Sequence, residues 1–191
     1  MSYEYINILL NKSKCFYIYY YIININNKNN IINLFIYGGV NMRPKYSYKN
    51  ISDWFLSKES MTPKKLQKLT YYAEAWAYAL FDEGILSDTS FQAWIHGPVS
   101  PKLWREYKDY GWNEIPKKEN NDYKLDKNTL ELLDAVWSTY GERTGYELEA
   151  ISHSETPWIN ARKGLEELET STKLIKPEDM KNYYRSIYTG D

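Results

Sequence analysis

Cysteine is nearly absent from this sequence, because Cys15 is the only one among 191 residues. A single thiol excludes an intramolecular disulfide, a cysteine-rich zinc finger and a cysteine-ligated iron–sulfur cluster. Scarce cysteine is typical of the reducing cytoplasm, and we expect that location. An excess of charge is also absent, since 24 basic residues face 25 acidic ones and the formal net charge is -1. The composition therefore indicates no general affinity for nucleic acids or anionic membranes.

Signatures of nucleotide, metal and hydrolytic sites are missing as well. No G-x-x-x-x-G-K-[ST] loop occurs, and no G-x-G-x-x-G follows a predicted strand. His153-x-Glu155 matches half of a zinc-deaminase signature, but the other half needs cysteines that the chain lacks. Ser152 and His153 have no nucleophile-elbow context, and His96 has no companion ligands near it in the sequence. We therefore predict no metal, no cofactor and no enzymatic activity, and keep a small hydrolytic enzyme using His96 only as a third alternative.

The first 41 residues differ in composition from the rest of the chain. They hold nine Asn, nine Ile and seven Tyr, whereas all seven Trp and all seven Pro follow Met42. The apolar stretch 15–23 is far shorter than the roughly 20 residues that a bilayer-spanning helix needs, so no membrane partner is indicated. Asn and Tyr crowd this stretch and no small-residue cleavage pattern follows, which argues against a signal peptide.

The genetic code suggests another interpretation of residues 1–41. Asn, Ile, Tyr, Lys and Phe are the residues that AT-rich noncoding DNA yields when it is translated. The two codons of Gly38-Gly39 can read GGAGGN, which resembles a ribosome-binding site just before the codon of Met42. We therefore expect residues 1–41 to be a mis-assigned upstream translation, disordered or irregular if made, and residues 42–191 to be the domain. The intact mass of the natively expressed protein tests this expectation.

Helix signals dominate residues 42–191. Thr62 can cap the clearest helix, Pro63 suits its first turn, and Gly84 offers a stop. Apolar residues recur within it at three- or four-residue spacing, which predicts a stripe that faces the core. With their caps and stops included, helices are expected over 50–57, 62–84, 100–111, 126–141, 144–153, 156–164 and 177–187. Either Asp126 or Asn128 can start the fourth of these helices.

A change of period indicates a small β element. Residues 90–96 alternate between apolar and polar side chains, which predicts one short strand, and Gly97-Pro98 breaks the pattern. The remaining signals are mostly helical. The predicted fold class is therefore mainly α with a small β element, in a compact helical domain of about six or seven helices.

Aromatic residues are abundant after Met42, with 13 Tyr, 7 Trp and 3 Phe. This number of aromatic residues exceeds what one small core needs, and Trp and Tyr are enriched at protein interfaces. Trp94 and Trp112 are less easily explained as core than the tryptophans on apolar stripes. The tryptophans that we expect in the core are Trp54, Trp76, Trp104 and Trp137.

Three lysines form a basic turn at the start of the helix that follows Thr62. Lys64, Lys65 and Lys68 could contact phosphate, but a solvated face is the better interpretation. The three side chains lie opposite the apolar stripe, and residues 42–191 are acidic overall. Because no separate helix-turn-helix segment is present either, DNA binding is not indicated.

Two stretches of the chain together resemble a known domain. Residues 61–76 read M-T-P-K-K-L-Q-K-L-T-Y-Y-A-E-A-W, and residues 91–101 read F-Q-A-W-I-H-G-P-V-S-P. This combination is similar to the Panacea domain, also called the SocA-like antitoxin domain and described in phage-associated proteins. That family is typified by a K-L-Q-K-L-x-Y-Y-A-x-x-W helix and a strand ending in A-W-x-x-G-P-V-x-P. Residues 155–158 and 175–180 resemble its later motifs, so the resemblance extends from about 51 to 188.

The resemblance implies an antitoxin, which neutralises a cognate toxin encoded in the adjacent gene by binding it directly. One branch of the family implies the alternative of a proteolytic adaptor that delivers the toxin to an ATP-dependent protease. The motif residues expected to form the framework of the fold are Leu66, Leu69, Tyr72, Ala73, Trp76, Pro101, Pro157 and Trp158. The candidate partner-binding residues, at the corner after the strand and in the following loop, are Trp94, His96, Gly97, Pro98, Val99 and Trp112.

Overall fold

The computed structural model describes residues 45–119 and 124–189, so the prediction about residues 1–41 lies outside the described residues. The described residues form seven α-helices, one 3-10 helix and a two-stranded antiparallel sheet, which confirms the predicted fold class. None of these helices combines the length and the apolar character that crossing a membrane requires. The elements are α2 (Tyr48–Leu56), α3 (Pro63–Phe81), β1 (Gln92–Trp94), β2 (Gly97–Val99), α4 (Pro101–Tyr107), η2 (Lys108–Tyr110), α5 (Lys127–Tyr140), α6 (Gly145–His153), α7 (Thr156–Ala161) and α8 (Pro177–Thr189).

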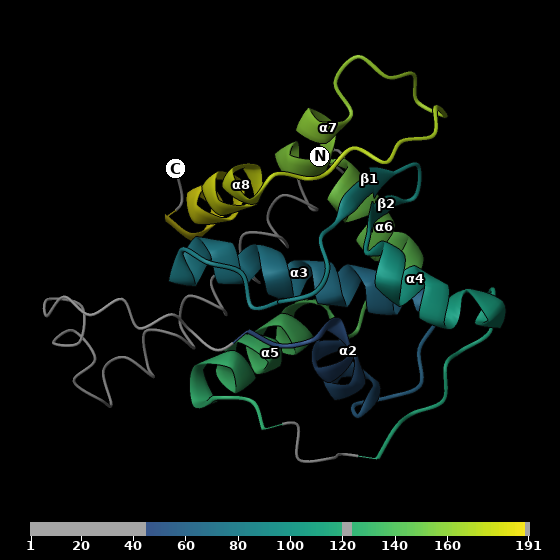
Figure 1. Cartoon of the computed structure of the whole chain (residues 1–191), viewed down its shortest axis with the longest axis vertical. Coiled ribbons are helices and arrows are strands. Elements are labelled where there is room, and N and C mark those ends of the chain that lie inside the picture. Colours follow the sequence, from purple (N-terminus) through teal and green to yellow (C-terminus); the bar gives the residue numbers. More distant parts are fainter. Residues whose placement is uncertain (1–44, 120–123, 190–191) are drawn as a thin grey trace, which may run out of the picture.

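Helix α3 is the centre of the fold. Figure 1 shows it crossing the middle of the molecule, with α2 and α5 on one side and the hairpin, α6 and α7 on the other. It contacts α2, α4, α5, α6, α8 and β2. The Oγ1 atom of Thr62 accepts a hydrogen bond from the backbone N–H of Lys65 at 3.3 Å, and Pro63 lies in the first turn. The predicted start of this helix is therefore confirmed.

The predicted stop at Gly84 is wrong. Helix α3 ends at Phe81, and Asp82 takes a left-handed φ of 66°. Gly84 lies farther on, where a Cβ atom would collide with the carboxylate of Glu74. That carboxylate accepts hydrogen bonds from two backbone N–H groups of the following loop, at 2.8 and 3.0 Å. Gly84 therefore makes room for a buried side chain of α3 and does not end the helix.

Local capping signals place the other helices close to their predicted positions. Asp126 accepts hydrogen bonds from the first N–H groups of α5, at 2.9 and 3.2 Å. Thr144 and Glu147 form the predicted capping box at the start of α6. Pro177 begins α8 as expected. Helix α2 starts at Tyr48, two residues before the predicted range, because Ser47 is its N-cap.

The inner face of α3 packs into an aromatic core. Tyr72 stacks on Tyr140 of α5 with ring centroids 4.0 Å apart. The indole Nε1 of Trp76 donates to the Tyr140 hydroxyl at 3.2 Å, and Tyr184 of α8 lies 5.1 Å from the Trp76 ring. A fully buried large apolar side chain contributes roughly 1.5–3 kcal/mol to stability, so the core explains much of the tyrosine content. The framework residues predicted for this face are all buried: Leu66, Leu69, Tyr72, Ala73 and Trp76.

The β element is a hairpin, whereas the sequence predicts a single strand over 90–96. Strands β1 and β2 pair antiparallel, with Gln92 opposite Val99 and Trp94 opposite Gly97. The two residues between them form the turn, and Gly97 takes a φ of +91°. Glycine adopts such a left-handed φ without steric cost. Gly97 therefore lets the chain reverse and pair at the point where the prediction placed a break.

Candidate functional site

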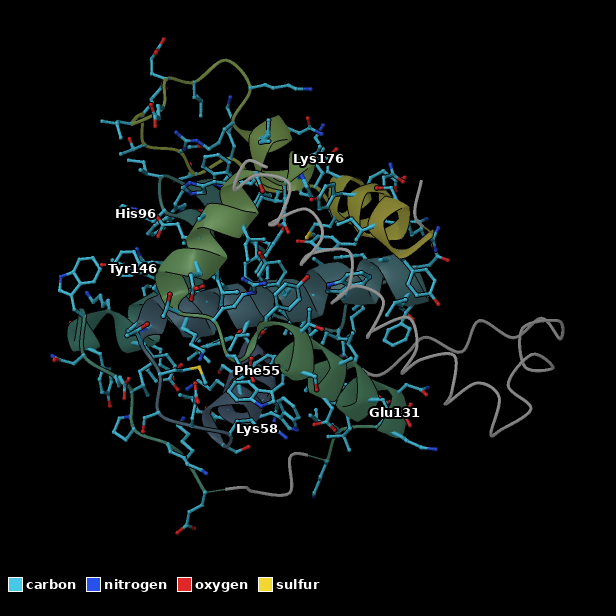
Figure 2. The ribbon with its side chains drawn as sticks, turned by 180° about the vertical axis from the view of Figure 1, so that it is seen from behind. Phe55, Lys58, His96, Glu131, Tyr146 and Lys176 are labelled. Atoms are coloured by element: carbon cyan, nitrogen blue, oxygen red, sulfur yellow. The ribbon has the colours of Figure 1, made fainter. Side chains whose placement is uncertain are left out.

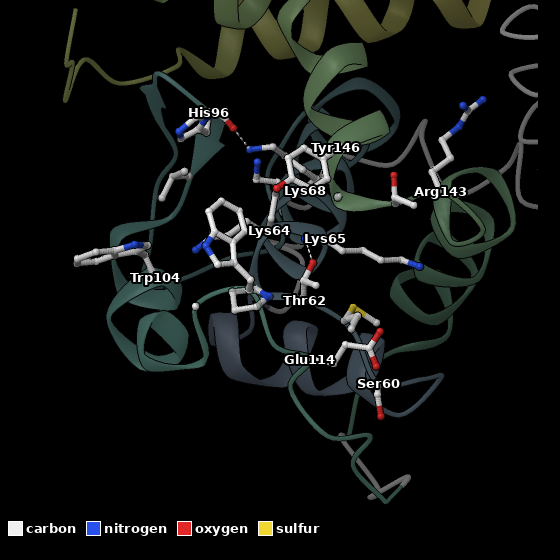
Figure 3. Close-up of a pocket in the computed structure, with 18 of the residues that line it drawn as sticks. Ser60, Thr62, Lys64, Lys65, Lys68, His96, Trp104, Glu114, Arg143 and Tyr146 are labelled. Carbon is white, nitrogen blue, oxygen red and sulfur yellow. Dashed lines mark hydrogen bonds between the residues drawn. The ribbon is translucent and has the colours of Figure 1, made fainter. Parts of the chain in front are cut away.

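A groove of about 740 Å³ opens at the N-terminal end of α3. Its walls come from the start of α3, the β1–β2 hairpin, the stretch from α4 to the loop after η2, and the start of α6. Figure 3 shows His96 and Trp104 at one end of this opening and Ser60 and Glu114 at the other. The volume lies within the range of ligand-binding clefts. We therefore take this groove as the candidate functional site.

Four aromatic side chains line the groove in two pairs. Trp94 meets Trp104 edge to face, with ring centroids 5.5 Å apart. Trp112 and Tyr146 lie nearly parallel, with an interplanar angle of 11° and 6.2 Å between centroids. Three of these side chains are exposed, to 41% for Trp104, 74% for Trp112 and 64% for Tyr146. The groove thus presents to solvent the residue types that dominate binding energy in protein interfaces.

The prediction that Trp104 belongs to the core is wrong. The buried residues of α4 are Leu103 and Tyr107. Trp104 follows Leu103 by about 100° of helix rotation, which turns its side chain out of the core and toward Trp94. The other tryptophans predicted as core are buried or half-buried: Trp54, Trp76 and Trp137.

The prediction of a solvated lysine face is also wrong. The side chains of Lys64 and Lys65 are only 16% and 11% exposed. The Lys64 Nζ atom lies 2.5 Å from the Glu149 carboxylate and 4.0 Å from the ring centroid of Tyr146. The Lys65 Nζ atom lies 2.5 Å from the Glu59 carboxylate. These amines are held within the fold because other elements cover the side of α3 that a helical pattern assigns to solvent.

Lys68 is buried beneath the hairpin, with 1% of its surface exposed. Its Nζ atom donates to the carbonyl oxygen of His96 at 2.5 Å (Figure 3) and to that of Pro98 at 3.1 Å. Burial lowers the pKa of the Lys68 ammonium to about 7, an effect that the charge of Glu149 opposes and that of Lys64 adds to. Lys68 therefore joins α3 to the backbone of the hairpin turn.

His96 and Tyr146 project from the same edge of the molecule (Figure 2). The Nδ1 atom of His96 lies 3.0 Å from a carboxylate oxygen of Glu149. Burial raises the pKa of Glu149, but the ion pair with Lys64 and the contact with His96 outweigh it, so the pKa is lowered. Glu149 of α6 is thus a carboxylate that binds both α3 and the hairpin.

The second histidine lies in a different environment. His153 stacks on Trp158 with ring centroids 4.1 Å apart, and burial lowers the pKa of its imidazole. Within residues 45–119 and 124–189, no three or more His, Cys, Asp or Glu side chains are grouped so that they could hold a metal ion.

The structure divides the six candidate partner-binding residues into four that line the groove and two that do not. Trp94, His96, Val99 and Trp112 line the groove, although Val99 keeps only 6% of its surface exposed. Gly97 and Pro98 are buried in β2 and do not line it. The hairpin folds these two residues onto α3 and α6, and their part in partner binding stays a prediction. That the remaining four bind a partner stays a prediction.

Tyr146 is a groove residue that the sequence analysis missed. It follows Gly145, the first residue of α6, where a Cβ atom would lie 2.9 Å from the backbone nitrogen of Lys65. Glycine therefore lets the start of α6 approach the start of α3, and this approach brings Tyr146 to the groove. The available signal was a tyrosine in the first turn of a capped helix, outside its apolar stripe.

Polar contacts attach the hairpin to the helices around it. The indole Nε1 of Trp158 donates to the backbone carbonyl of Trp94 at 3.0 Å. The side-chain amide of Gln67 exchanges two hydrogen bonds with the backbone of Ser100, at 2.9 and 3.1 Å. Motif residues of α3 and α7 thus hold one wall of the groove. The predicted framework prolines lie in the first turns of α4 and α7: Pro101 and Pro157.

Comparison with known protein families gives a match over the middle of the chain. The family model described as Antitoxin SocA-like, Panacea domain, matches residues 66–159. No curated protein and no solved structure matches the chain. The matched segment contains all four aromatic residues of the groove. It is shorter than the predicted range of 51–188 and leaves out α2 and α8, although both pack against α3.

Proposed function

Residues 66–159 form a SocA-like Panacea antitoxin domain, and from this premise we propose that the protein neutralises its toxin by binding it directly. The toxin is the product of the adjacent gene, and it is held by noncovalent contact, with no bond made or broken. The groove at the start of α3 is the surface that binds it.

The exposed aromatic side chains of the groove support this proposal most strongly. Trp112, Tyr146 and Trp104 are exposed, and they lie within one cavity of about 740 Å³. Interface hot spots are enriched in Trp and Tyr and cluster in pockets from which binding expels water. A cavity of this size admits a protruding segment of a partner, so we expect part of the toxin to insert into it.

Co-expression with the adjacent gene tests the function. The product of that gene should arrest growth alone and should be neutralised by the wild-type protein. Trp112→Ala should weaken binding by about 2 kcal/mol, roughly 30-fold in affinity, because it removes the most exposed ring of the groove. Growth should then be inhibited when both genes are expressed at equal levels.

Leu168→Ala is the matched control. Leu168 is 77% exposed, but it does not line the groove and lies outside the matched segment. Its truncation should leave both neutralisation and affinity unchanged. A neighbouring product that is harmless alone, or that stays toxic beside the wild-type protein, contradicts the proposed function.

A further inference from the structure

The turn of the β1–β2 hairpin rests on one buried ammonium group. Lys68 reaches from α3 and donates to the carbonyl oxygens of His96 and Pro98, on either side of Gly97. A Cβ atom on Gly97 would lie 2.7 Å from the Lys68 Nζ atom and 2.8 Å from the Ser152 Oγ atom. The close approach of the lysine to the hairpin backbone therefore requires glycine at position 97.

The hairpin is also a wall of the groove. Trp94, His96 and Val99 belong to it or to its turn, and all three line the cavity. Trp158 fixes the carbonyl of Trp94, whereas Lys68 fixes the carbonyls of His96 in the turn and of Pro98 in β2. The position of these lining residues thus depends on the two hydrogen bonds that the Lys68 side chain donates to the hairpin.

We propose that Lys68 is a positioning residue for toxin recognition, whose ammonium holds the hairpin in the place that the toxin contacts. Loss of the ammonium proton weakens toxin binding although Lys68 itself does not touch the toxin. This inference rests on the proposed function of the groove, and it adds a control of that site by pH.

The charges around Lys68 determine the direction in which pH changes toxin binding. Lys64 of α3 repels the ammonium and Glu149 of α6 attracts it, while the imidazoles of His96 and His153 are the other titratable groups of the cluster. Burial outweighs the attraction, so the pKa of Lys68 is lowered to about 7. Hydrogen bonds from a charged donor are roughly twice as strong as those from a neutral one. The hairpin is therefore held most firmly below pH 7.

The toxin binds the hairpin in the position that the Lys68 ammonium holds, so toxin binding favours the protonated form of the Lys68 amine. By linkage, the toxin raises the pKa of Lys68, and affinity falls as pH rises through that of the free protein. A rise of one pKa unit on binding corresponds to about a sevenfold loss of affinity between about pH 6 and pH 8.5.

Affinity measurements at these two pH values test the proposal, with the purified product of the adjacent gene as the probe. Relative to the affinity of Lys68→Met, which carries no titrating amine, wild-type affinity should fall about sevenfold from about pH 6 to pH 8.5. Lys68→Arg stays charged throughout and should show the flat profile of Lys68→Met. Titration of the toxin itself affects all three proteins alike, so only the difference between profiles counts. Identical profiles for wild type and Lys68→Met overturn the inference.

A second measurement uses the wild-type protein and needs no variant. The Cε carbon signal of Lys68, followed by NMR in lysine-labelled protein, should titrate near pH 7 and move to higher pH when the toxin is bound. A midpoint that does not rise on binding contradicts the positioning role, even if the variants fail to fold. Toxin that fails to bind the wild-type protein at any pH overturns the proposed function. Toxin that binds without a Lys68-dependent pH profile overturns this inference alone.

Discussion

Buried charged side chains of this protein bind backbone groups. The Lys68 ammonium donates to two hairpin carbonyls, and the Glu74 carboxylate accepts two N–H groups of the loop after α3. The guanidinium of Arg162 donates to the Ala93 carbonyl of β1 and to three carbonyls of the loop 166–169. A buried charge without such partners is costly, so each of these contacts fixes the path of a loop or strand.

The packing of Gly97 against Lys68 gives a prediction about stability. Gly97→Ala should lower the free energy of unfolding by about 2–3 kcal/mol, because it combines a left-handed φ with a clash against the Lys68 amine. Chemical denaturation measures this change.

Gly111→Ala is the control for the backbone effect alone. Gly111 also has a positive φ, of +56°, but a Cβ atom there meets nothing within 4 Å. Its replacement should cost about 1 kcal/mol, and equal losses for the two alanine variants would argue against tight packing at Gly97.

Glu155 predicts a dependence of stability on pH. It is buried and accepts a hydrogen bond from the Tyr184 hydroxyl at 2.6 Å. Burial raises its pKa from 4.5 to about 8, although the hydrogen bond from Tyr184 and the nearby Tyr72 hydroxyl oppose the rise. The folded state therefore keeps a proton that the unfolded state loses, and the contribution of Glu155 to stability falls as pH rises from about 4.5 to 8.

Replacement by the neutral amide removes that dependence. Glu155→Gln should gain stability relative to the wild type as pH rises from about 5 to 8, in urea unfolding curves recorded across that range. Other titrating groups, Glu74 among them, affect both proteins equally. Parallel pH profiles of the two proteins would contradict a raised pKa at Glu155.

Sequence patterns at this scale identify the apolar core and miss the buried polar side chains. The predicted α3 stripe from Leu66 to Trp76 is buried, because apolar spacing reports directly on the face turned to the core. The same spacing assigns Lys68 to solvent, where the hairpin actually covers it. A helical pattern records the polarity of a side chain, but it contains no information about which distant backbone lies over it.

Helices and strands differ in how far local signals determine them. The starts of α3, α5 and α6 are set by side chains within three residues of the first turn, so they are predictable. The return strand β2 has three residues, and it is held by contacts from α3 as well as by its pairing with β1. Those contacts join residues about 30 positions apart, so no local pattern predicts β2. The sequence alone therefore predicts one strand followed by a break.

The capping box of α6 gives a prediction for one element. Thr144→Ala should cost about 1 kcal/mol of stability, because the Thr144 Oγ1 atom accepts the N–H of Glu147. Thr144→Ser keeps the hydroxyl and should retain most of that stability. Because Tyr146 lies in the same turn, we also expect the alanine variant to lose some toxin affinity, measured by titration calorimetry. If Thr144→Ala lost as little stability as Thr144→Ser, the capping role would be contradicted.

The groove exists only at the scale of the whole molecule. Its lining residues come from segments between positions 59 and 146, brought together by the packing of the hairpin, α4 and α6 on α3. Trp94 and Trp112 were separable from the core by sequence because they lie off the apolar stripes. The pairing of Trp112 with Tyr146 was not predictable, since it depends on the approach of α6 to α3 through Gly145.

Direct binding predicts that neutralisation needs no other component. The protein should therefore protect a host that lacks its ATP-dependent proteases, and the toxin should persist there in a complex. Growth rescue and toxin level, measured together, check this prediction. Rescue that disappears with the proteases would instead indicate that the protein delivers the toxin for degradation.

Hydrogen exchange of the free protein and of its complex with the adjacent gene product is the most direct test of the groove as the toxin site. We predict that binding slows exchange in residues 59–68, 94–99, 104–114 and 142–146, the segments that line the groove, and leaves the loop around Leu168 unchanged. Slowed exchange confined to other surfaces, with these four segments unaffected, would contradict the account.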